Sequence, residues 1–244
     1  MRQLIFAAPL LLSLLNLCPV PCFAQSESTN VGISRVGIGV KISTLGPGIE
    51  AAYELSPRLN VRGGFNDFSY GVNSTNNGIR YNGTLTLRSA QASLDWFFWH
   101  SLHLSPGLVF YNGNRASATA SAIGQSFTLN NITYLSNPAT PITGTGTVKF
   151  SRVGPSIMFG VGNLVPRGHR FSISFEIGGV YQGSPNVTLN LTGSACDPTG
   201  TNCRNVATDP GIQSNVQAQQ TKYNSDISRY KFWPVISLGF GFKL

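Results

Sequence analysis

Apolar side chains recur at every second residue through eight separate runs of this chain, and this alternation constrains the fold more than any other feature of the sequence. In the first run the apolar positions are Val36, Ile38, Val40 and Ile42. Successive side chains of a β-strand point to opposite faces, so a period of two predicts strands with one apolar face. The runs lie within residues 31–44, 49–55, 59–66, 90–98, 102–110, 152–161, 171–178 and 232–244.

The second face of these strands carries mainly glycine, serine and isolated charges. Only 11% of the residues are charged, which is less than half of the roughly 25% usual in soluble domains. A soluble sandwich would present far more Lys, Glu and Asp to water, whereas a membrane barrel turns its apolar face to lipid and small polar residues inward. Unpaired strand edges are not tolerated in hydrocarbon. We therefore predict an all-β protein, a closed antiparallel eight-stranded transmembrane β-barrel.

The connections between the runs alternate in length, as in outer-membrane barrels with short periplasmic turns and longer extracellular loops. The short connections are 56–58, 99–101 and 165–169, and the longer ones are 71–78, 116–144 and 193–229. Gly46-Pro47-Gly48 is predicted to form a small external turn. Within the long loops we expect a hairpin at 125–134 and a weak helix after Asp209.

The first residues have the layout of a cleavable secretory signal. Arg2 precedes an apolar run from Leu4 to Leu17, and a small-residue cleavage site ends at Ala24. We therefore expect a signal peptide at residues 1–24 and a single outer-membrane β-barrel domain at residues 25–244.

Cys196 and Cys203 remain beyond that segment, with a proline and a glycine between them. An exported protein can keep a disulfide, so we predict that the two are bonded, with two free thiols as the alternative. A lipoprotein anchored at Cys18 or Cys22 is disfavoured, because neither cysteine follows a small residue.

Nine charged residues are assigned to the inward face. The basic ones are Arg35, Lys41, Arg62, Arg152 and Lys243, and the acidic ones are Glu50, Glu54, Asp95 and Glu176. An eight-stranded barrel is just wide enough for its side chains to fill, and unpaired buried charge is very costly. We therefore expect these charges to pair and close the lumen, with an ion or solute path as the alternative.

Gly37-Ile38-Gly39-Val40-Lys41, the run from Leu59 to Phe65 and the C-terminal strand carry a family resemblance. The chain resembles the small eight-stranded outer-membrane β-barrels of the OmpW-like and OmpA-type superfamily over about residues 31–244. Its last strand looks like the signal recognised by the barrel-assembly machinery, although it ends in leucine instead of an aromatic residue. The residues that carry this signal are Ser237, Gly239, Phe242 and Leu244.

No constellation in the sequence indicates an enzyme, a cofactor or a metal site. The histidines, His100, His103 and His169, are expected at or near periplasmic turns, and no Gly-x-Ser-x-Gly motif occurs. The net charge is +8, but the basic residues are scattered singly, which disfavours nucleic acid and favours anionic envelope lipids.

The expected location is the cell outer membrane, in contact with lipid and lipopolysaccharide, and the expected role is structural or surface-interacting. The alternative is a narrow, porin-like channel or portal for small solutes, apolar ones included. The loops, rich in Ser, Thr, Asn, Gly and Gln, either bind a surface ligand that the sequence does not identify or act as solvated spacers.

Overall fold

The structure is a computed structural model of the chain, and it describes residues 34–76 and 79–244. The expected signal peptide, residues 1–24, lies outside the described residues. Across the described ranges, no helix combines the length and the hydropathy needed to cross a membrane.

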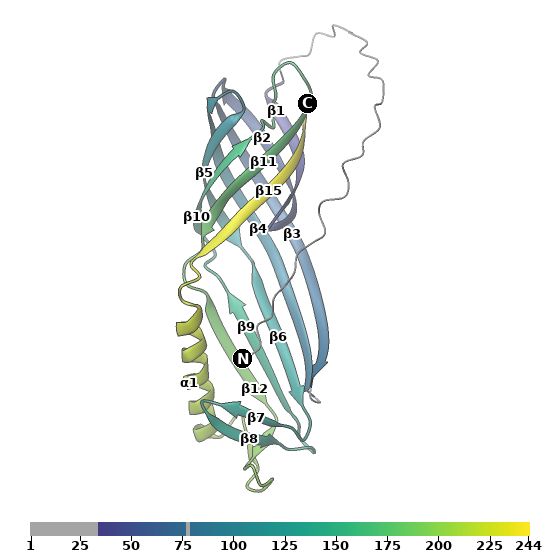
Figure 1. Cartoon of the computed structure of the whole chain (residues 1–244), viewed down its shortest axis with the longest axis vertical. Coiled ribbons are helices and arrows are strands. Elements are labelled where there is room, and N and C mark those ends of the chain that lie inside the picture. The colour runs from purple at the N-terminus through teal and green to yellow at the C-terminus, as the bar shows by residue number, and fades with distance from the viewer. Residues whose placement is uncertain (1–33, 77–78) are drawn as a thin grey trace, which may run out of the picture. The chain divides into compact units, whose positions relative to one another are not determined.

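Eight antiparallel strands close into a circle, called the ring below. They are β1 (Val36–Ser43), β2 (Gly46–Ser56), β3 (Leu59–Asn76), β4 (Ile79–Trp99), β5 (Leu102–Asn112), β10 (Gly154–Val161), β11 (Phe171–Tyr181) and β15 (Phe232–Lys243). Each strand pairs with the next in this order, and β1 pairs with β15 from Gly37↔Lys243 to Ser43↔Ser237 (Figure 1). Each of the eight alternating runs therefore contributes one strand to the ring.

The alternation separates an outward and an inward face of the ring. On the outward face Val40 is 57% exposed and Ile157 is 55% exposed, whereas Lys41 and Glu50 on the inward face are each 5% exposed. Soluble proteins bury apolar residues and expose charged ones, so the ring has the opposite arrangement.

The first turn differs from the prediction at Gly46-Pro47-Gly48. Gly46 already belongs to β2 and pairs with Ser43, so Thr44 and Leu45 alone reverse the chain. Gly46 has a φ of 98°, a left-handed conformation that glycine adopts without steric cost. This tight reversal directs Leu45 into the ring, where it is buried.

Beyond the ring the same sheet goes on as five strands, called the extension. β3 and β4 stay paired without interruption from Asp67↔Arg88 to Asn76↔Ile79. The other strands of the extension are β6 (Arg115–Ala122), β9 (Ile142–Lys149) and β12 (Asn186–Thr192). β6 follows β5, β9 precedes β10 and β12 follows β11, and the order is β12-β9-β6-β4-β3 (Figure 1). The expectation of long loops at 71–78 and 116–144 is therefore wrong, because residues 71–76 and most of 116–144 pair as strands.

One helix and a small sheet complete the extension. The helix α1 (Pro210–Ile227) begins after Asp209, whose side chain accepts a hydrogen bond from the Ile212 amide at 2.9 Å. The small sheet consists of β7 (Ser126–Leu129), β8 (Ile132–Ser136), β13 (Ser194–Cys196) and β14 (Arg204–Asn205). Ile212 and Val216 of α1 are buried in one cluster with Leu129 and Ile142. The hairpin and the helix expected in the long loops are both present.

Side-chain amides of α1 cover the edge of β12. Asn224 accepts a hydrogen bond from the Val187 amide at 2.7 Å and donates one to the Val187 carbonyl at 3.1 Å. Gln220 accepts from the Leu189 amide at 2.9 Å. These bonds take the place of a neighbouring strand, which protects an edge that would otherwise pair with another chain.

The two faces of β3 and β4 exchange polarity where the ring meets the extension. In the ring, the outward residue Phe65 is apolar and the inward residue Asn66 is polar and fully buried. Beyond Asp67 the outward positions are Ser69, Gly71, Asn73 and Thr75. The first three inward positions beyond Asp67 are apolar and are Phe68, Tyr70 and Val72. No register shift interrupts the β3–β4 pairing, so the residues themselves make the exchange, at the level of the Asp67–Arg88 ion pair of 2.9 Å.

Candidate functional site

Buried charged or polar side chains fill the middle of the ring and form the charge cluster. They come from inward positions on six strands, β1, β2, β3, β4, β5 and β11. The members are Lys41, Glu50, Arg62, Asp95, His103, Ser105 and Glu176, and each is at most 8% exposed. The alternation positions them, because each stands between residues that face outward.

Arg62 lies at the centre of the charge cluster and bonds three carboxylates. Its Nη1 donates to Glu50 Oε2 at 3.2 Å and to Glu176 Oε2 at 2.9 Å. Its Nη2 donates to Asp95 Oδ1 at 3.0 Å and also to Glu176 Oε1, so the pair with Glu176 is bidentate. A planar guanidinium with five donors suits such an arrangement, which a lysine ammonium could not reproduce.

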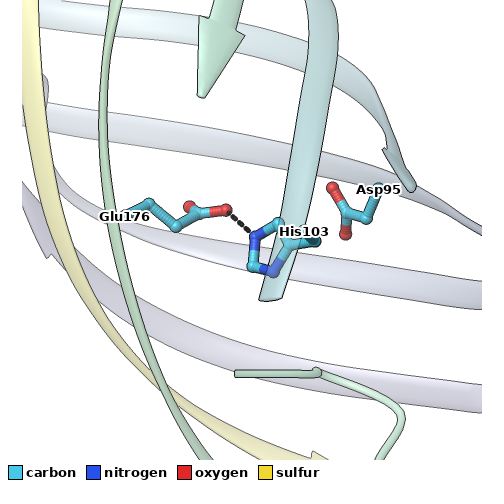
Figure 2. A group of neighbouring side chains, drawn as sticks. All are labelled: Asp95, His103 and Glu176. Carbon is cyan, nitrogen blue, oxygen red and sulfur yellow. Dashed lines mark hydrogen bonds and ion pairs between the residues drawn. The ribbon is translucent and has the colours of Figure 1, made fainter. Parts of the chain in front are cut away.

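Each carboxylate of the charge cluster has a further partner besides Arg62. Lys41 Nζ lies 3.5 Å from Glu50 Oε2, and Ser105 Oγ donates to Asp95 Oδ1 at 2.7 Å. His103 Nε2 lies 3.0 Å from Glu176 Oε1, and Figure 2 shows Glu176 and Asp95 on opposite sides of the imidazole.

The charge cluster combines acidic and basic side chains at close range. Its three carboxylates face the basic side chains of Lys41 and Arg62, and the imidazole of His103 contacts Glu176. Buried charges are stable only when paired and hydrogen-bonded, and the loss of one partner leaves the others uncompensated. The cluster therefore behaves as a unit, in which no single charge can be removed cheaply.

Inward glycines provide the space for these side chains. A Cβ at Gly160 would lie 2.7 Å from Glu176 Cγ and 2.8 Å from His103 Nε2, closer than real Cβ contacts come. A Cβ at Gly239 would lie 3.3 Å from Glu50 Oε1. The glycines of the inward face thus leave room for the charged residues of neighbouring strands.

The structure brings together five of the nine predicted lumen charges, and these are Lys41, Glu50, Arg62, Asp95 and Glu176. Lys243 is also buried, but it has no ion pair among the described residues. Arg35 and Arg152 precede β1 and β10 and are exposed, and Glu54 near the end of β2 pairs with exposed Arg167 at 3.3 Å. The prediction fails for these three because the alternation does not show where the ring interior ends.

The sequence prediction placed His103 near a periplasmic turn but left it out of the lumen charges, whereas its side chain lies inside the ring and is 3% exposed. It stands between the outward residues Leu102 and Leu104, so the alternation already contained the signal for its inward position. With Asp95 and Glu176 it offers ligand atoms within 4.8 Å of one another, a donor set that suits a divalent transition metal. Arg62 already bonds both carboxylates, so a metal ion there would meet the guanidinium charge. We therefore assign these residues to ion pairing.

Apolar side chains fill the ring at the end that holds the short turns. The connection between β10 and β11, residues 162–170, folds inward and buries Leu164 and Val165 against Ala52. Asn163 Oδ1 fixes it by accepting hydrogen bonds from Asn60 and from the Val165 amide, both at 2.9 Å. Leu164 occupies the positions that side chains at Gly37 and Gly241 would take.

A second apolar layer fills the end of the ring that faces the extension. It consists of the buried residues Leu45, Val109, Met158, Val180 and Val235. Between this layer and the charge cluster lies a cavity of about 20 Å³, which has room for about one water molecule. The ring interior is therefore filled along its length by apolar, charged and again apolar side chains.

The other predicted residues lie outside the charge cluster. Cys196 and Cys203 form a disulfide beside α1, with their Cα atoms 3.9 Å apart. On β15, Ser237 is buried, and Phe242 stacks edge-on against Phe171 with ring centroids 5.2 Å apart. Gly239 lies in the strand and Leu244 follows it, 56% exposed. Recognition of this strand by the assembly machinery remains a prediction.

No protein-family profile matches this chain, and no curated protein matches it by sequence. Among solved structures, Acinetobacter baumannii CarO aligns with a TM-score of 0.54 and 20% identity, over 87% of this chain and 98% of that chain. CarO2 of the same organism aligns with a TM-score of 0.54 and 19% identity, over 86% and 98%. A major outer membrane protein from Thermus thermophilus reaches 0.28 with 14% identity over 86% and 99%, too low to establish a common fold. The chain therefore shares the β-barrel fold of the CarO structures.

Proposed function

We propose that this chain is an integral outer-membrane β-barrel protein of the small eight-stranded type, with a structural or surface-interaction role. In this proposal the ring spans the membrane and the extension stands on its outer side. The observation that carries it is the polarity exchange on β3 and β4 at the level of Asp67 and Arg88. On the ring side of this level the outward face suits hydrocarbon, and on the extension side the outward face suits water.

The dimensions and the aromatic residues of the ring support this placement. A membrane-crossing β-strand needs about 9–11 residues, and β2, β5 and β11 have 11 each. Trp96 and Trp99 are exposed at the turn end of β4. Tyr181 and Phe232 meet edge-on at the other end, with ring centroids 5.1 Å apart. Aromatic girdles at both interfaces are typical of outer-membrane barrels.

A cysteine-labelling experiment on intact cells tests the placement. Val61 and Ser69 lie on the same outward face of β3, on opposite sides of Asp67. We expect a membrane-impermeant maleimide to label Ser69→Cys and to leave Val61→Cys unlabelled, because lipid covers the second position. Fractionation should recover both variants in the outer membrane, with a gel band that shifts on boiling. Equal labelling of both positions, or recovery in the soluble periplasm, would contradict the proposal.

The filled ring interior supports a closed lumen. Between the charge cluster and the apolar layer nearest the extension lies a cavity of about 20 Å³, too small for a hydrated ion. We expect purified protein to give no steady current in a planar lipid bilayer. A steady ionic current from the parent protein would contradict the closed lumen and favour the channel alternative.

A second candidate function, a portal for small apolar solutes, is favoured by the inward face of the extension. Phe68, Tyr70 and Val72 are 39%, 58% and 50% exposed there, next to the filled ring. An apolar solute held on this face would have no path through the ring and would pass sideways to the membrane. Binding of an apolar fluorescent dye tests this function, because Tyr70→Asp should weaken it whereas Ser69→Asp, on the other face, should not.

A further inference from the structure

The outer face of the extension, opposite the face that holds α1, carries an ordered array of hydroxyl and amide side chains. The strand register aligns one row across β4, β6, β9 and β12, made of Asn82, Thr119, Thr145 and Asn190. The Oγ1 atoms of Thr119 and Thr145 lie 3.3 Å apart. Every residue in this row is exposed or half-buried. Side chains of this kind both donate and accept hydrogen bonds, which suits them to the hydroxyl groups of sugars.

Two cations lie side by side on the same face, in the part nearest to the ring. Arg115 of β6 and Lys149 of β9 are direct partners across the strands, and both are exposed. Within the described residues neither forms an ion pair with a carboxylate. Like charges that face each other directly on neighbouring strands destabilise a sheet, and an anion between them would remove this repulsion. The pair is therefore complementary to a phosphate group.

The outward residues of β4 show the order in which these surfaces follow one another. Ala90 belongs to the apolar surface of the ring, Arg88 lies at the level of the polarity exchange, and Thr86, Thr84 and Asn82 follow. The sequence of surfaces is thus apolar, then charged, with Arg115 in register beside Thr86, then hydroxyl-rich. An outer-leaflet glycolipid presents its groups in the same order, as acyl chains, phosphates and sugars.

We propose that the outer face of the extension binds the phosphorylated saccharide of lipopolysaccharide. Arg115 and Lys149 contact a phosphate, and the row of Thr119 and Thr145 contacts the sugars beyond it. This inference rests on the proposed function, because it needs the extension to stand outside the outer leaflet.

The test measures binding of purified lipopolysaccharide, native or dephosphorylated, to the immobilised full-length protein. The double variant Arg115→Gln with Lys149→Gln should bind native lipopolysaccharide roughly tenfold more weakly, while its affinity for the dephosphorylated form should equal that of the parent. Arg170→Gln with Lys231→Gln is the matched control, since it removes two exposed cations elsewhere and should leave binding unchanged. Thr119→Val with Thr145→Val should weaken binding of both forms.

Two results would overturn the inference. Equal binding of native lipopolysaccharide by the parent and by the Arg115/Lys149 double variant would show that these cations contact no phosphate. An equal loss in the control variant would show general charge attraction. Fractionation of the same proteins separates this failure from that of the proposed function. A parent protein found in the periplasm would contradict both proposals. A parent protein in the membrane whose lipopolysaccharide binding does not depend on phosphate would overturn this one alone.

Discussion

Replacement of Arg62 by methionine removes the central cation of the charge cluster while keeping most of the side-chain volume. Arg62 bonds three buried carboxylates, and the loss of one partner from a buried pair costs about 3–5 kcal/mol. Each carboxylate keeps a further partner, Lys41, Ser105 or His103, so we expect a total near this range of about 3–5 kcal/mol instead of a multiple of it. Arg88→Met, which breaks the exposed pair with Asp67, should change stability little.

The unfolding free energy should be measured by urea titration in lipid vesicles, followed by the heat-shifted gel band. Arg62→Met combined with Asp95→Asn and Glu176→Gln should recover part of the loss, because a neutral buried group needs no counter-charge. A loss of less than about 1 kcal/mol for Arg62→Met, as expected for an exposed ion pair, would contradict the central role of Arg62. A triple variant no more stable than Arg62→Met alone would contradict it as well.

Three further predictions follow from other parts of the molecule. Ile157→Arg on the outward face should lower the unfolding free energy by about 2–4 kcal/mol in the same titration if lipid surrounds the ring. Tyr223→Arg is the control, because Tyr223 is 44% exposed on α1 and the change should be tolerated. Equal effects of the two changes would argue against a lipid-facing surface. Gly160→Ala should cost about 1–3 kcal/mol by overpacking the charge cluster, whereas Gly63→Ala should be neutral because its Cβ would meet nothing closer than 3.9 Å. The hydrogen bond from the Ile212 amide and the guanidinium of Arg204 lower the pKa of Asp209. The contribution of Asp209 to the stability of α1 is therefore complete above the unfolded pKa of about 3.9, and it is lost as the pH falls through the lowered pKa. Asp209→Ala should speed hydrogen exchange at the start of α1 at neutral pH, and Asp209→Asn, which also caps helices, should not; no difference between them would contradict the capping role.

The ring was predictable because every strand carries large apolar residues at alternate positions. The extension escaped prediction because β6 and β9 alternate Ala or Gly with Ser or Thr, and small residues give little strand signal. The spacing from Phe65 to Phe68 was a usable sign, since apolar residues three apart in a strand mark a change of face.

The members of the charge cluster were largely predictable, but their partners were not. The alternation places Arg62 and Glu176 inside the ring, yet they lie 114 residues apart, and only the closed register brings them together. Arg35 and Arg152 were misassigned because periodicity does not fix the point where a strand ends. The apolar layers were missed for a related reason, since Leu45 and Leu164 fall outside the alternating runs and Val165 begins a connection that was predicted to be a short turn.

The inward-folded connection between β10 and β11 has a consequence for the order of assembly. Leu164 rests on Gly37 and Gly39 of β1 and on Gly241 of β15, and these are the first and last strands of the barrel, which pair to each other. We therefore expect the seam to close over a connection that is already in position, with that connection as a template for the last pairing step. We expect a side chain at Gly37 or Gly241 to stall the chain as an open sheet during insertion, so that the defect appears as slow closure more than as a weakened mature barrel.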